Sequence, residues 1–218
     1  MSIDHVLMIG FGGPARREDV RPFLEEVAGG RDIPPARLAE VEHHYEQTGG
    51  SSPYNQYAHQ LFDRVREALA ASGVTLPVFL GLRHAAPRIT DVVREIHGRQ
   101  LKHGVAIVLA PHRAYASFGK YVQNIEEAKI ASSAQAIRYD YVRPWHDHPG
   151  FIDAQADRVR GLLQAVPLKE RAGTHLLFCA HSIPMEMPGR SHYEDEFRRS
   201  SQLVAQSLKH DFWRAAYQ

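Results

Sequence analysis

Near its C-terminal end the chain reads His175-Leu-Leu-Phe-Cys-Ala-His181-Ser-Ile-Pro184. The four consecutive apolar residues from Leu176 to Cys179 are typical of a strand buried on both faces, and the run breaks at a histidine, a serine and a proline. In a parallel α/β sheet, ligands collect outside the carboxyl ends of the strands, so His181 is a candidate functional residue. Because the chain has 14 histidines, the alternative is a histidine that merely closes a turn.

Strands and helices alternate along the whole chain. Apolar runs predict further strands at residues 5–9, 77–82, 105–109, 136–142 and 212–217. Helical periodicity and capping signals predict helices at residues 18–27, 36–47, 89–100, 117–133, 150–165 and 193–209. This alternation predicts the α/β class, with parallel sheets flanked by helices.

A break near His112 to Ser117 suggests two Rossmann-like domains. The first would span residues 1–114 and the second residues 115–218. An α/β domain seldom ends on a strand, so we expect the second domain to be incomplete and the sequence to be truncated.

More helix lies between the first two predicted strands than a simple crossover needs. A helix following Ser51-Ser52-Pro53 places Tyr57, Leu61, Val65 and Leu69 at four-residue spacing, which predicts its buried side. The surplus, about residues 18 to 55, is predicted to be a lid or a cleft wall.

Composition excludes several classes of protein. The chain has 26 basic and 25 acidic residues, and no basic cluster alternates with aromatic residues, so nucleic acid is not an expected partner. The single cysteine, Cys179, excludes an intrachain disulfide framework and a cysteine zinc cluster. We find neither a signal peptide nor an apolar run long enough to span a membrane, and we expect a cytoplasmic protein.

The first strand is followed by the glycine-rich stretch Gly10-Phe-Gly-Gly-Pro14. Glycines permit positive φ angles and close approach of the backbone to a ligand. A dinucleotide-binding turn is disfavoured, because Arg16 stands where the third glycine belongs and no acidic residue ends the next strand. A loop facing some other flat ligand is preferred, and a nucleotide-binding Rossmann protein is the weaker alternative.

Three predicted strands end at a histidine: His84, His112 and His181. A single histidine at such a place is usually structural, hydrogen-bonded in a loop. Three at equivalent strand ends indicate a cluster near a crevice.

Five motifs together resemble the ferrochelatase family, which inserts ferrous iron into a porphyrin in haem biosynthesis. They are Gly10-Phe-Gly-Gly-Pro14, Tyr45-Glu-Gln-Thr-Gly-Gly-Ser-Ser-Pro53, Gly81-Leu-Arg-His84, Val108-Leu-Ala-Pro-His112 and Ala180-His-Ser-Ile-Pro184. They occur in the family's order and at close to its spacing. The resemblance implies the class II chelatase fold, in which two Rossmann-like domains enclose a porphyrin cleft.

The resemblance also implies roles for individual residues. His181 matches the active-site histidine that meets the metal or accepts a pyrrole proton. Phe11 matches a position on the iron side of the macrocycle that is a tyrosine in some members, and a phenylalanine has no oxygen with which to ligate. Arg31 and Ser52 match positions near the porphyrin propionates. His84 and His112 match motif histidines that are structural or cleft-lining.

The chemistry of metal insertion explains why a histidine is needed. Two pyrrole protons must leave the porphyrin, and a neutral imidazole can accept one near pH 7 or hold Fe²⁺. The expected enzyme is a metal chelatase of the lyase class, with Fe²⁺ as substrate metal, no organic cofactor, and protoporphyrin IX or coproporphyrin III as partner.

In the family, the catalytic histidine faces a glutamate from a later segment that this sequence does not reach. The alternative is therefore a catalytically impaired chelatase-like protein that binds porphyrin or metal without turnover. The oligomeric state is left open.

Overall fold

The computed structural model describes residues 2–183 and 190–218. The chain divides into two compact units. The first comprises Met1–Leu109 and Tyr121–Val142, and the second comprises Ala110–Lys120 and Arg143–Gln218. No helix within the described ranges combines the length and the apolar character that crossing a lipid bilayer requires.

The first unit is built on a four-stranded parallel sheet with the strand order β2-β1-β3-β4. The strands are β1 (His5–Gly10), β2 (Val78–Leu82), β3 (His103–Val108) and β4 (Arg138–Tyr141). Every residue of β1 is buried, as expected for a strand with neighbours on both edges and helices on both faces. The predicted α/β class with a parallel sheet is confirmed.

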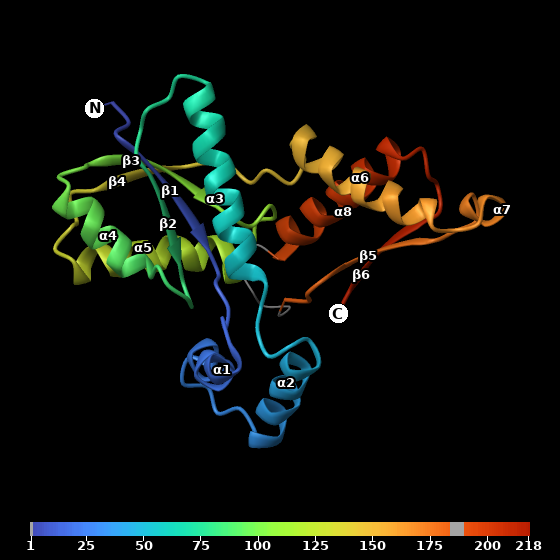
Figure 1. The fold of residues 1–218 in the computed structure, drawn as a ribbon, viewed down its shortest axis with the longest axis horizontal. Coiled ribbons are helices and arrows are strands. Elements are labelled where there is room, and N and C mark those ends of the chain that lie inside the picture. The colour runs from blue at the N-terminus through green and yellow to red at the C-terminus, as the bar shows by residue number, and fades with distance from the viewer. Residues whose placement is uncertain (1, 184–189) are drawn as a thin grey trace. The chain divides into compact units, whose positions relative to one another are not determined.

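Helices cover both faces of this sheet. They are α3 (Tyr54–Ala71), α4 (Ile89–Gly98) and α5 (Lys120–Ala131). The 3₁₀ turn η1 (Arg17–Asp19), α1 (Val20–Ala28) and α2 (Pro35–Gln47) follow β1, and Figure 1 shows α1 and α2 side by side, away from the faces of the sheet. Ala58 of α3 packs with Met8 and Leu80 on one face. On the other face, Ile89 of α4 lies against Gly81 of β2. Helix α5 lies beside α4 (Figure 1).

The predicted buried side of α3 is wrong in its first half. Tyr57 is 61% exposed and Leu61 is 44% exposed, whereas Ala58 is buried and Phe62 packs against the core. The reason is the anchor at the start of the helix: Tyr54 packs against the same core cluster and so sets which residues face the sheet. Positions one and two turns later, 58 and 62, therefore point inward.

The second unit contains the two-stranded parallel sheet of β5 (Leu176–Ala180) and β6 (Trp213–Tyr217). Its helices are α6 (Pro149–Gln164), α7 (Leu168–Arg171) and α8 (Arg190–Ser207), and a π-helical turn η2 spans Tyr115–Gly119. A small core of Ile152, Ala156 and Val204 packs against Phe178 of β5.

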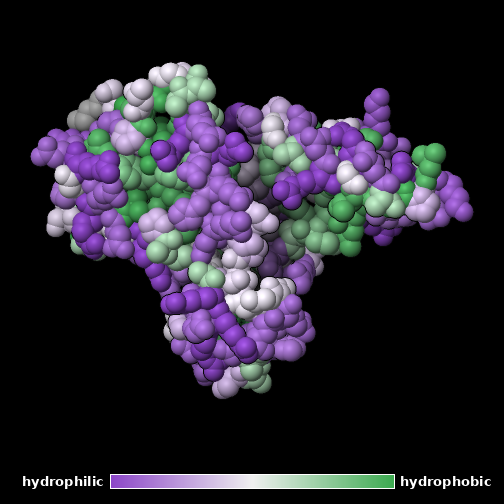
Figure 2. Space-filling model, viewed as in Figure 1, coloured by the Kyte–Doolittle hydropathy of each residue, from purple (hydrophilic) through white to green (hydrophobic). Residues whose placement is uncertain are grey.

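The prediction that β5 is buried on both faces is wrong. Phe178 packs on the α6 and α8 core, but Leu177 is 64% exposed and Cys179, the single cysteine, is exposed as well. Within the described residues only one face of this sheet is covered, so alternate side chains meet solvent. Figure 2 shows hydrophobic surface around α7 and β5, where Leu168 and Leu177 are exposed.

Candidate functional site

The loop after β1 places Phe11 at the carboxyl edge of the sheet. Its N–H donates to the hydroxyl of Tyr54 at 2.9 Å, and its carbonyl accepts from the N–H of His84 at 2.8 Å. The Phe11 ring is half-buried, and its centroid lies 4.7 Å from that of the His84 ring. The N–H and the carbonyl of Phe11 are therefore both held by hydrogen bonds. The Phe11 side chain provides an apolar contact surface.

The glycines of this loop allow three segments to approach closely. Gly12 has a φ of +79°, and a Cβ there would lie 2.8 Å from the backbone N of Ala85. A Cβ on Gly13 would lie 2.8 Å from that of Ser52, and Asn55 bonds both backbone groups of Gly13 at 2.9 and 2.8 Å. Close backbone approach was predicted here, and the neighbours found are other parts of this unit.

Ser52 lies where the chain enters α3. Its N–H donates to the carbonyl of Pro14 at 2.8 Å, and its Oγ accepts from the N–H of Tyr54 at 3.2 Å. The serine thereby ties the start of α3 to the glycine-rich loop, although the N-cap position of α3 is Pro53 and not a serine. Its contact with a porphyrin propionate stays a prediction.

Arg31 follows α1 in the chain and is exposed. Its Nε donates to the carbonyl of Ala28 at 2.9 Å, so in this structure the guanidinium caps the C-terminal end of α1. Its predicted role at a propionate stays a prediction.

His84 belongs to a charged network that the sequence reasoning missed. Its Nδ1 lies 3.0 Å from Oε1 of Glu26, and Arg88 donates to both oxygens of that carboxylate at 2.5 and 2.9 Å. The hydrogen bonds from Arg88 lower the pKa of Glu26, so the carboxylate is ionised and His84 donates through Nδ1. Burial lowers the pKa of His84 and keeps its ring neutral at pH 7.

A cavity of about 350 Å³ adjoins this network. It lies beside the glycine-rich loop, and its lining includes Gly13, Phe23, Glu26, His84 and Arg88. An aromatic wall, an ion pair and a neutral imidazole thus meet at the carboxyl end of the sheet, where ligands of parallel α/β proteins bind.

His181 lies in the second unit, directly after β5, as predicted, and its side chain is exposed. The residues on either side continue the β5–β6 ladder: Gln218 donates its N–H to the carbonyl of Ala180 at 2.9 Å and accepts from the N–H of Ser182 at 3.0 Å. A solvent-accessible imidazole is therefore carried by a firmly paired backbone. Pro184 of the same motif lies outside the described residues.

His112 is also in the second unit and is half-buried. Its Nε2 lies 2.9 Å from Oγ of Ser200. That hydroxyl donates to backbone carbonyls, the shorter bond being to His146 at 2.7 Å, so it accepts from His112. Burial, with His146 as a second cause, lowers the pKa of His112 to about 4. This histidine is neutral at physiological pH and serves as a hydrogen-bond donor.

A buried carboxylate, Glu196, lies one turn before Ser200 on α8. It accepts from the backbone N–H of Arg113 at 2.5 Å, and the Arg113 Nε lies 3.6 Å away. The Glu196 carboxylate therefore anchors Arg113, the residue that follows His112. Glu196 was missed by the sequence reasoning, because nothing local distinguishes it from other helical glutamates.

Tyr193 contacts two of the three motif histidines, His112 and His181. The His112 ring lies edge-on to Tyr193 at 6.2 Å, and the Tyr193 hydroxyl bonds the His181 carbonyl. His84 belongs to the other unit, so a cluster of all three stays a prediction. Within the described ranges, no group of three or more His, Cys, Asp or Glu side chains is arranged to hold a metal ion.

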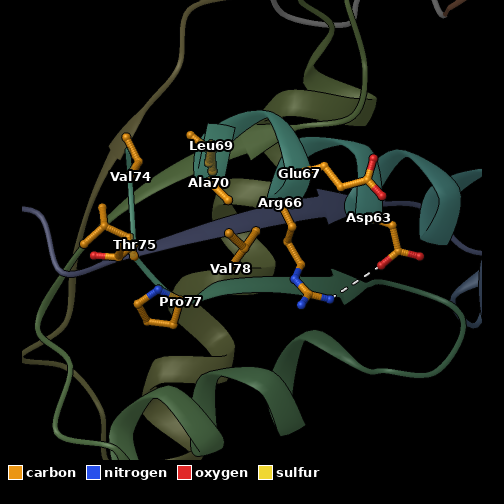
Figure 3. A pocket seen from close by; sticks show the side chains of 10 residues that line it. Asp63, Arg66, Glu67, Leu69, Ala70, Val74, Thr75, Pro77 and Val78 are labelled. Carbon is orange, nitrogen blue, oxygen red and sulfur yellow. Dashed lines mark ion pairs between the residues drawn. The ribbon is translucent and has the colours of Figure 1, made fainter. Parts of the chain in front are cut away.

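A different cavity, of about 570 Å³, is lined by the C-terminal half of α3 and by residues leading into β2. Figure 3 shows the ion pair of Arg66 and Asp63 beside it, with 3.6 Å between nitrogen and oxygen. The cavity reaches Val78, the first residue of β2, and so lies toward the amino end of that strand. We do not assign the candidate site to it, because ligands collect at carboxyl ends.

Comparison with known proteins shows which family the chain belongs to. A protein-family model described as Ferrochelatase matches residues 4–218. The ferrochelatase of Rhodopirellula baltica is 36% identical over 99% of this chain and 61% of its own length. The coproporphyrin III ferrochelatase of Streptomyces coelicolor is 36% identical over 94% of this chain and 56% of its own length. The ferrochelatase of Deinococcus radiodurans is 33% identical, over 98% and 68%. The chain thus spans about 60% of the length of curated relatives that it matches.

Among solved structures, the sirohydrochlorin chelatase SirB of Bacillus subtilis subspecies spizizenii, in complex with cobalt, superposes with a TM-score of 0.53. The match covers 99% of this chain and 67% of that one, at 12% identity. At this identity the likeness shows the fold alone, which is the α/β fold of a chelatase.

Proposed function

The chain belongs to the ferrochelatase family, and we propose that it carries out insertion of ferrous iron into a porphyrin in haem biosynthesis. In this proposal it is a metal chelatase of the lyase class. The observation that carries it is His181, an exposed imidazole on a hydrogen-bonded backbone at the carboxyl end of β5, within a family match over residues 4–218.

The proposed role of His181 follows from the chemistry of the imidazole. A porphyrin loses two pyrrole protons as it takes up a divalent metal. A neutral imidazole beside the ring accepts one such proton near pH 7, or binds Fe²⁺ through nitrogen during delivery. In both cases the reacting atom is a ring nitrogen of His181, which is accessible to solvent.

The remaining assignments concern the domains and the residues that would contact the porphyrin. Two Rossmann-like domains stay a proposal, and β4, which falls within the second predicted domain of residues 115–218, pairs with β3 in the first compact unit. Phe11 offers an apolar face to the macrocycle, and Arg31 and Ser52 are proposed partners of the propionates. Relatives named ferrochelatase and coproporphyrin III ferrochelatase both match this chain, so protoporphyrin IX and coproporphyrin III are both candidate substrates.

The experiment compares the wild-type chain with His181→Ala in anaerobic insertion of Fe²⁺, followed by the absorption spectrum of each porphyrin. We expect at least a 100-fold loss of insertion rate in the variant, with porphyrin binding retained. His97→Ala, which removes an exposed histidine from α4, should insert metal at the wild-type rate. Equal rates for the wild type and His181→Ala would exclude His181 from the mechanism.

A second candidate is a protein that holds porphyrin without turnover. It is favoured by the surroundings of His181 within the second unit, because no described hydrogen bond or ion pair there joins its ring to a carboxylate. Normal porphyrin affinity with no metallated product, even at high Fe²⁺ or Zn²⁺, would establish this alternative.

A further inference from the structure

The carbonyl of His181 has its own partner, which the paired backbone on either side does not supply. The hydroxyl of Tyr193 donates to this carbonyl at 3.0 Å, from a residue twelve positions later in the chain. The peptide plane that follows His181 also contains the Ser182 N–H, which donates to Gln218. Because the carbonyl and the N–H of a trans peptide point in opposite directions, the bond from Tyr193 anchors this plane from its second side.

Tyr193 is itself held in place by the packing of α8. Residues 193, 196, 197 and 200 are spaced so that they share one face of the helix. Ser200 bonds the ring of His112 and Glu196 bonds the backbone of Arg113, which fixes the height of α8 against that segment. The segment is short and bonded at two successive residues, so the helix cannot slide along it without breaking both hydrogen bonds.

Aromatic contacts set the direction of the Tyr193 ring. The His112 ring lies edge-on to it at 6.2 Å and 89°, and the Tyr217 ring lies 6.5 Å away. Burial raises the pKa of Tyr193, so its hydroxyl keeps its proton and remains a donor at physiological pH. The ring is thus fixed from two sides, with its hydroxyl aimed at one carbonyl.

We propose that Tyr193 is a positioning residue for His181: its hydroxyl holds the His181 carbonyl and thereby aims an exposed imidazole that no hydrogen bond to its ring holds within the described residues. This rests on the proposed function of His181. Displacement of a reacting group by a fraction of an ångström lowers the rate of a reaction without lowering substrate affinity. Loss of the Tyr193 hydroxyl is therefore expected to lower kcat and to leave KM unchanged.

The test is Tyr193→Phe, which keeps the ring contacts and removes only the hydroxyl. Loss of one hydrogen bond corresponds to about a fivefold change, and misalignment increases it, so we expect kcat for metal insertion to fall about fivefold to twentyfold. The KM for porphyrin should stay within about twofold of wild type. The matched control is Tyr217→Phe, because the Tyr217 hydroxyl donates to the Glu194 carbonyl at 3.4 Å and not to His181. It should leave both constants unchanged.

A second readout does not depend on activity. In protein labelled with ¹³C at the histidine carbonyls, the His181 resonance is identified by its absence in His181→Ala. We expect Tyr193→Phe to shift or broaden this resonance and Tyr217→Phe to leave it in place. An unmoved resonance, or equal losses of kcat in the two variants, would overturn the positioning role. If the wild type inserts no metal but the resonance moves as expected, the proposed function fails while the contact stands.

Discussion

Acidification should destabilise the second unit through His112, and replacement by glutamine isolates this effect. The pKa of His112 is lowered by burial from its ordinary 6.5 to about 4. Between these values the unfolded chain binds a proton that the folded chain refuses, so lowering the pH favours unfolding. The stabilisation is complete above pH 6.5 and is lost as the pH falls to about 4.

The size of the effect follows from the two pKa values. The pKa of His112 differs by about 2.5 between the unfolded and the folded chain. Because a change of one in pKa is worth about 1.4 kcal/mol, this difference corresponds to about 3 kcal/mol of stability. His112→Gln keeps a donor for Ser200 and cannot titrate. We therefore expect the free energy of unfolding to fall by about 2 to 3 kcal/mol more in the wild type than in the variant between pH 7.5 and pH 4.5.

Urea unfolding followed by tryptophan fluorescence measures this difference. The two tryptophans, Trp145 and Trp213, both lie in the second unit, so the signal reports on the unit that contains His112. His97→Gln, at an exposed position on α4, should show the wild-type pH dependence. Parallel curves for wild type and His112→Gln would show that His112 takes up protons in the folded protein, and the reasoning from its burial would be refuted.

Two further predictions concern the first unit. Gly104→Ala should destabilise the protein by about 1 to 3 kcal/mol in urea unfolding, because a Cβ there would meet Nε2 of the fully buried His5. Gly98→Ala, with nothing within 4 Å of the new carbon, is the control and should be neutral or slightly stabilising, and equal effects would disprove the packing argument. Glu26→Gln should lower the free energy of unfolding by about 1 kcal/mol, because Arg88 loses a bidentate carboxylate partner. An unchanged midpoint in urea would show that this ion pair contributes nothing to stability.

The sequence was sufficient for the class of fold and for the ends of the strands. The apolar runs that became β2, β3 and β5 are local signals, and the predicted end of each strand lies within one residue of the observed end. His84, His112 and His181 therefore lie in the loops where they were expected. The periodicity of one segment carries this information without knowledge of its neighbours.

The packing partners of each helix and strand could not be predicted from the local sequence. The exposed face of β5 depends on what covers the sheet, and the buried side of α3 depends on the anchor at Tyr54. The partner of His84 is Glu26, 58 residues away, and no short-range pattern distinguishes it from the other glutamates of the chain. Tyr193 was likewise invisible as a partner of His181, because the hydrogen bond depends on how α8 packs.

We propose that this chain inserts metal into porphyrin through His181, and the other assignments depend on this step. The most direct measurement is anaerobic insertion of Fe²⁺ into coproporphyrin III or protoporphyrin IX by the purified chain, set against the same mixture without protein. We expect a rate well above the uncatalysed one for the wild type and a background rate for His181→Ala. A wild-type rate equal to background would contradict it.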